Sequence, residues 1–109
     1  MTHIPLTTSL EWAQILKKDG LPQSSTFFFR EDGLLIYSEY KYLSPRFDWY
    51  SAYTLGELIR WLPSNYSIEK AGSGQFRVGG YFDYSPENTA AAALHYFAHE
   101  GIISVKDLV

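Results

Sequence analysis

The sequence of 109 residues contains no cysteine. This absence excludes disulfides, thiolate zinc sites, paired-cysteine redox chemistry and cysteine nucleophiles. Long hydrophobic runs are also missing, because the strongly apolar stretches 27–29, 34–37 and 90–94 fall far short of the roughly 20 residues that span a bilayer. The first 20 residues lack a basic start followed by an apolar stretch, which predicts no signal peptide. We therefore expect a soluble, cytoplasmic protein without a membrane partner.

An excess of positive charge is absent as well. Nine Lys and Arg residues face twelve Asp and Glu residues, which leaves a net charge of −3 and a pI of about 5.5. Proteins that bind nucleic acid usually present a basic face to the phosphates. The order of predicted elements resembles that of a double-stranded-RNA-binding domain, but the last helix begins at Pro86-Glu87-Asn88-Thr89, without a lysine or arginine. The sequence thus argues against nucleic acid as a partner.

Helix signals occur at three places. Residues 9–18 carry an apolar stripe after a choice of capping residues, Thr7, Thr8 or Ser9, and Gly20 follows as a stop. Residues 54–62 begin with the capping-box pair Thr54 and Glu57 and end before a proline. Residues 86–100 follow the cap Ser85 and stop at Gly101.

Strand signals form two hairpins. Asp32-Gly33 is a turn signal between the apolar runs 26–30 and 34–40. A glycine-rich turn at 71–74 separates strand 66–70 from a longer strand, 75–83, in which Gly79-Gly80 predicts a bulge or a close approach of the backbone. Residues 41–53 show no helical or strand period, and the apolar tail 102–109 is predicted to form an edge strand.

These elements predict one α+β domain over residues 1–109, in the order α-ββ-α-ββ-α. We expect an antiparallel sheet from two β-hairpins, with the helices packed on one face. Each hairpin is followed by a Ser-Pro pair and a helix, at Ser44-Pro45 and Ser85-Pro86, which suggests an internal duplication.

Motifs for catalysis are missing. There is no Gly-x-Ser-x-Gly sequence, and no Gly-Lys-Ser/Thr follows the glycines. His95 and His99 lie four residues apart on one side of the last helix, a spacing that can hold a metal ion. Tyr96 follows the first histidine where a metalloprotease has glutamate, and no spacing enforces a third ligand, so two histidines near solvent are the simpler interpretation. We predict no catalytic residue, no metal site, no cofactor and no enzyme activity.

Aromatic residues are abundant, at 17% of the chain, and they concentrate in residues 37–53. Tyrosine, tryptophan and arginine dominate the residues that contribute most to protein–protein binding. The sequence supports two interpretations, an exposed interface or an irregular strand whose rings fill the edge of the sheet. For the first, the predicted binding residues are Tyr40, Tyr42, Arg46, Phe47, Trp49 and Tyr50.

On this interpretation Arg46, Trp49 and Tyr50 would anchor a protein partner, which would be a host protein or a second copy of the chain, as in a homodimer. The alternative function is a pocket for a small ligand or a nucleotide. In such a pocket the rings would stack on a planar group, and Arg46 or Arg77 would bind an anion.

One stretch also supports a resemblance. Residues 53–63, Y-T-L-G-E-L-I-R-W-L-P, resemble the T-L-x-E-L-x-x-x-L-P helix of small proteins encoded by phages and prophages of Bacteroides-type bacteria. Residues 87–103 resemble the last helix of those proteins, so that the resemblance covers residues 53–103. It implies a mobile-element origin and a small accessory role, and it assigns no function to individual residues.

Overall fold

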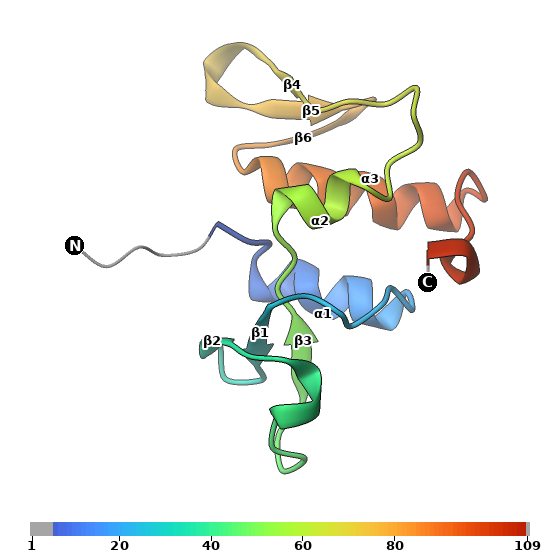
Figure 1. Ribbon diagram of the computed structural model, residues 1–109. Helices are drawn as coiled ribbons and strands as arrows, with labels where there is room; N and C mark the ends of the chain where they lie inside the picture. The colour runs from blue at the N-terminus through green and yellow to red at the C-terminus, as the bar shows by residue number, and fades with distance from the viewer. Residues whose placement is uncertain (1–5, 109) are drawn as a thin grey trace.

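The computed structural model describes residues 6–108. Two three-stranded antiparallel sheets lie at opposite ends of a layer of helices (Figure 1). Helix α1 (Leu10–Lys18) contacts the first sheet, and α3 (Pro86–His99) contacts α1, α2 (Leu55–Ile59) and the second sheet. The α+β class and both antiparallel hairpins are confirmed. The hairpins lie in separate sheets rather than in one, however, and each sheet has a third strand.

Local capping explains where the helices begin. Ser9 Oγ accepts a hydrogen bond from the backbone N–H of Trp12, which selects Ser9 among the three predicted caps of α1. Thr54 and Glu57 form the predicted capping box of α2, and Ser85 caps α3. Helix α2 ends at Ile59, earlier than predicted, because the chain continues through two i→i+3 hydrogen bonds into a tighter turn.

The first sheet has the strand order β2-β1-β3. Strands β1 (Phe27–Arg30) and β2 (Leu35–Tyr37) form the predicted hairpin, and Gly33 adopts a φ of +94° in its turn. Strand β3 (Trp49–Ser51) pairs with the other edge of β1, although residues 41–53 show no strand period; a strand at this edge is one of the two interpretations given above for the aromatic segment. Three residues are too few to show a period, and the partner of β3 lies about twenty residues away, so no local signal marks this strand.

The second sheet has the order β4-β5-β6. The predicted strand 75–83 is instead a hairpin of β5 (Phe76–Val78) and β6 (Tyr81–Asp83), because Gly79-Gly80 forms a turn and not a bulge. Gly79 has a φ of +59°, and a Cβ atom there would lie 3.4 Å from the ring of Tyr66. Strand β4 (Glu69–Lys70) is shorter than predicted.

Two further predictions fail. The predicted edge strand in the tail is a 3-10 helix, η3 (Val105–Leu108), which packs on the core beside α3; Val109 lies outside the described residues. The internal duplication is not supported either, because the central strand comes first in the chain in one sheet and second in the other.

Helix α3 passes through the middle of the core. Its small Ala90 and Ala91 let Leu16, Tyr53 and Leu58 approach closely on one side. On another side, Ala93 and Phe97 pack with Val78 of the second sheet. The first sheet contacts α1, α1 contacts α3 and α3 contacts the second sheet, so two helices join the sheets into a single domain.

Candidate functional site

Three exposed tyrosines surround the end of β2, and we call them the tyrosine rim: Tyr37, Tyr40 and Tyr42. They are 76%, 55% and 72% exposed, respectively. Tyr37 is the last residue of β2, and the other two begin and end the 3-10 helix η1 (Tyr40–Tyr42). The sheet ends where the Ser38 N–H donates to the Thr26 carbonyl, and the tight turn that follows places the next rings beside Tyr37.

The rim is held partly in place by the strand beneath it. The ring of Tyr37 lies 5.4 Å from that of Phe27, and the ring of Tyr40 lies 5.8 Å from that of Phe28, centroid to centroid. The ammonium group of Lys41 lies 5.1 Å from the ring of Tyr42. Such contacts limit the orientations of the rings while leaving much of each ring open to solvent.

A hollow of about 530 Å³ lies beside the rim. Its lining includes Ser24, Thr26, Glu39 and all three rim tyrosines. The carboxylate of Glu39 pairs with Lys41 at 3.3 Å, and among residues 6–108 Glu39 is the only charged residue in the lining. A second hollow of about 520 Å³ shares Tyr40 with the first and is also lined by Lys17, Phe47 and Trp49.

The structure divides the six predicted binding residues into two groups. Tyr40, Tyr42, Arg46 and Phe47 are exposed, whereas Trp49 is only 9% exposed. The indole N–H of Trp49 donates to the Ser44 carbonyl at 2.8 Å, which closes the loop between η1 and β3. Trp49 therefore supports the segment from within, as one of the two interpretations expected.

Tyr50, the remaining predicted residue, is half-buried, and its ring lies 4.9 Å from the ammonium of Lys17. Successive residues of a strand face opposite sides of the sheet, so Trp49 and Tyr50 do not share one surface. Tyr37 was not among the predicted binding residues although it is the most exposed of the rim. The predicted strand 34–40 placed Tyr37 in its middle, whereas β2 ends at Tyr37 and lies at the edge of its sheet, which leaves the ring exposed.

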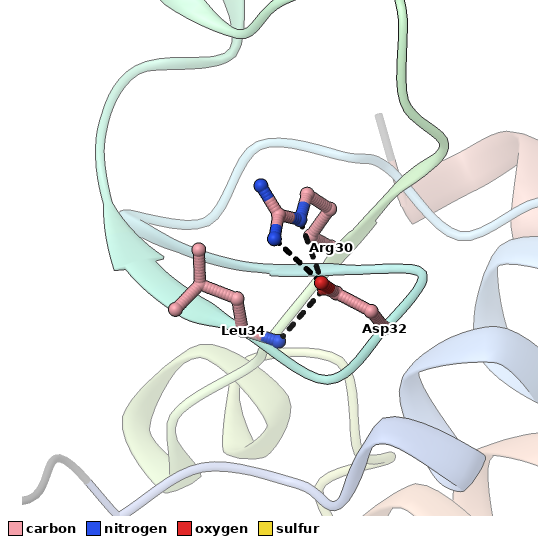
Figure 2. Close-up of polar contacts among 3 residues, drawn as sticks. All are labelled: Arg30, Asp32 and Leu34. Carbon is pink, nitrogen blue, oxygen red and sulfur yellow. Dashed lines mark hydrogen bonds and ion pairs between the residues drawn. The ribbon is translucent and has the colours of Figure 1, made fainter.

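The turn of the β1–β2 hairpin, at the opposite end of β2 from Tyr37, carries a tight ion pair. Figure 2 shows both carboxylate contacts of Asp32: the guanidinium of Arg30, with Nε at 2.8 Å, and the backbone N–H of Leu34 at 3.3 Å. Hydrogen bonding by Arg30 is the main cause that lowers the pKa of Asp32 to about 2. Arg30 also lies over the ring of Phe47, with its guanidinium carbon 4.6 Å from the ring centroid. The charge of Arg30 thus interacts both with the Asp32 carboxylate and with this ring.

The arginines predicted to bind an anion are elsewhere. Arg46 and Arg77 do not line the hollow beside the rim. Arg77 is in the second sheet, where its guanidinium pairs with Glu69 at 2.7 Å. The geometry therefore gives a nucleotide phosphate no cationic partner in that hollow.

The two histidines of α3 are on one side of the helix, as predicted, but a third residue joins them. Asp19 follows α1 and contacts both imidazoles. No local sequence signal identifies Asp19 as the third member of the cluster, because 76 residues separate it from His95.

No family model matches this chain, and neither a curated protein nor a solved structure shows significant similarity to it. Within residues 6–108, no helix combines the length and apolar character needed to cross a membrane.

Proposed function

We propose that this chain is a non-enzymatic interaction protein that binds a protein partner through the tyrosine rim. The observation that carries this proposal is the high exposure of Tyr37, Tyr40 and Tyr42 within one short segment, residues 37–42. In keeping with the resemblance of residues 53–103, the proposal includes an accessory role in a phage or other mobile element and a cytoplasmic location. The partner is a host protein or a second copy of the chain.

The chemistry of the rim suits a protein surface. Tyrosine combines a large apolar ring with a hydroxyl that can bond to backbone groups, and it is enriched at interfaces for this reason. Packing of Tyr37 and Tyr40 on Phe27 and Phe28 reduces the side-chain entropy that binding would cost. These rings are therefore partly organised before a partner arrives.

The backbone next to the rim offers a second mode of contact. Strand β2 is an edge strand, and in the described part of the chain its outer side has no partner strand. An extended segment can add to such an edge through main-chain hydrogen bonds. Since Tyr37 ends this strand, a partner paired with β2 would also contact the rim.

The composition of the hollow supports binding rather than catalysis. Its lining contains serine, threonine, tyrosine and one glutamate, and that glutamate is already paired with Lys41. A general acid or base needs a titratable group within hydrogen-bond reach of the substrate, usually with a shifted pKa. The carboxylate in this lining, Glu39, is held by Lys41 at 3.3 Å and is therefore not free for that role.

The proposal predicts that Tyr37→Ala/Tyr42→Ala loses the partner. Parent and variant would be compared by affinity capture from bacterial lysate with quantitative mass spectrometry, followed by a Kd measurement with the purified partner. Loss of interface anchors typically costs about 2 kcal/mol or more, so we expect Kd to rise by about thirtyfold or more. Sedimentation analysis of both proteins would show whether the partner is a second copy.

Tyr84→Ala is the matched control. Tyr84 is 69% exposed, close to the value for Tyr42, but it follows β6 of the second sheet. The Tyr84→Ala variant should bind the partner with the same Kd as the parent. Equal binding by all three folded proteins, or no partner and no self-association for the parent, would contradict the proposal.

A small neutral ligand in the hollow is the second candidate. The volume of about 530 Å³ lies within the usual range for ligand pockets, about 300–1,000 Å³. A planar, uncharged compound could stack on the rim without a cationic residue. A compound that raises the melting temperature of the parent and of Tyr84→Ala, but not of Tyr37→Ala/Tyr42→Ala, would favour this candidate.

A further inference from the structure

Three potential metal ligands meet between the end of α1 and the last turns of α3. The carboxylate of Asp19 contacts His95 Nδ1 at 2.5 Å through Oδ2 and His99 Nε2 at 3.0 Å through Oδ1. One ligand atom from each residue lies within 4.8 Å of the other two. The cluster thus joins two helices that are far apart in the sequence.

The placement of Asp19 favours a cation beside it. Its side chain is only 8% exposed. It directly follows a helix C-terminus, where the helix dipole disfavours negative charge. Among residues 6–108, its only ion-pair partners are the two histidines, whose charge depends on protonation. A buried carboxylate in this position is stabilised by a full positive charge.

Of the two histidines, His95 is held by packing against its neighbours, whereas His99 is open to solvent. His95 is 22% exposed, and its ring packs edge-on against Trp12 with centroids 5.9 Å apart. His99 is 61% exposed, one turn further along the same helix. A metal held here would therefore keep at least one position open to solvent.

We propose that Asp19, His95 and His99 bind one divalent transition-metal ion, for which Zn²⁺ is the best match. Two imidazole nitrogens and one carboxylate oxygen suit zinc, whereas magnesium and calcium prefer oxygen ligands. Bonds of about 2.0–2.2 Å in tetrahedral geometry place ligand atoms roughly 3.4 Å apart. The contacts of 2.5 and 3.0 Å, made by the two different oxygens of Asp19, would have to open by less than about 1 Å. The separations between the three ligand atoms are at most 4.8 Å, so none would have to close by more than about 1.4 Å.

The bound metal would clamp the end of α1 to α3. It would bind the folded chain in preference to the unfolded chain, in which Asp19 and His95 are distant, and so it would stabilise the fold. This site is separate from the tyrosine rim: none of its three ligands lines either hollow described above. Failure of one proposal therefore leaves the other unaffected.

Calorimetric titration of tag-free, chelator-treated protein with ZnCl₂ tests the site. The parent should bind one Zn²⁺ per chain, and its melting temperature should rise when Zn²⁺ is added. His99→Ala should weaken binding by at least about tenfold, because even loss of an outer partner of a metal ligand costs that much. His99 is the most exposed ligand, so this variant should keep its fold, which circular dichroism would verify. Asp19→Asn should also weaken binding.

His3→Gln is the matched control, because His3 is the one other histidine in the sequence. It should bind Zn²⁺ as the parent does. Co²⁺ provides a second probe, since its visible absorption would report histidine coordination in the parent and in His3→Gln but not in His99→Ala. Absence of saturable binding in the parent, or parent-like affinity in His99→Ala, would overturn the proposal and leave the cluster as a hydrogen-bonded clasp.

Discussion

Asp32 shows how one residue can stabilise a turn. Its carboxylate is paired with Arg30 and accepts a hydrogen bond from the Leu34 N–H, which lowers its pKa to about 2 (Figure 2). Because this value lies below the roughly 3.9 of an unfolded chain, the pair stabilises the fold above about pH 4. That contribution is lost as the pH falls through about 2.

We predict that an NMR titration of the Asp32 carboxyl has its midpoint at about 2 in the parent. Arg30→Gln removes the main cause of the shift, so the midpoint should rise toward about 3.9. Arg46→Gln is the control, since this exposed arginine does not contact Asp32, and the midpoint should stay where it is in the parent. A midpoint near 4 in the parent would contradict the ion pair.

The tyrosines of the aromatic segment show that the sequence does not predict which individual rings are buried. Tyr53 is fully buried, donates to the Pro22 carbonyl and accepts from the Gln23 amide, and burial raises the pKa of its hydroxyl. Tyr42 is 72% exposed. Both residues belong to the same aromatic segment, and the difference between them depends on which side of the fold each ring faces.

At the scale of the element, α3 depends on small side chains. Ala91 is fully buried where α3 packs on the cluster of Leu16, Tyr53 and Leu58. Ala91→Leu adds three carbons without space for them, while the helix propensity changes little. We predict a loss of about 1–3 kcal/mol in the free energy of unfolding, measured by urea denaturation.

Ala98→Leu provides the comparison within the same helix. Ala98 is half-buried beyond the crowded positions, so the free energy of unfolding should change by no more than about 0.5 kcal/mol. Equal losses for both variants would mean that close packing of α3 does not limit side-chain size at Ala91.

At the scale of the whole molecule, stability should be uneven. Helix α3 contacts both other helices and the second sheet, whereas β4 consists of two exposed residues at a sheet edge. Local opening costs least where few apolar contacts are broken. We predict that hydrogen exchange followed by mass spectrometry protects amides of α3 longest and releases those of 69–74 early. Equal protection of the two regions would contradict this picture.

The separation of the two proposed sites also belongs to this scale. The tyrosine rim lies on the first sheet, and the Asp19 cluster lies where α1 meets α3. The position of neither site can be predicted from the order of helices and strands along the chain. They follow from how the first sheet, α1 and α3 stack on one another (Figure 1).

The sequence by itself determined the α+β class, the presence of three helices, the caps of α2 and α3, and the turn at Gly33. These features follow from signals within a few residues, such as the Thr54–Glu57 capping box, and local chemistry suffices for them. The aromatic segment was also visible as a candidate site. Which of its rings would be exposed was not, since burial is not a local property.

Only the tertiary structure decided the remaining features. Strand β3 forms by pairing with the free edge of β1. Trp49 is buried beneath the aromatic segment rather than exposed. Asp19 contacts His95, although 76 residues separate them in the sequence. The physical reason is the same each time: the partner that gives the residue its role is distant in sequence. Packing of the helices and sheets brings it within contact distance, and no short-range pattern records that contact.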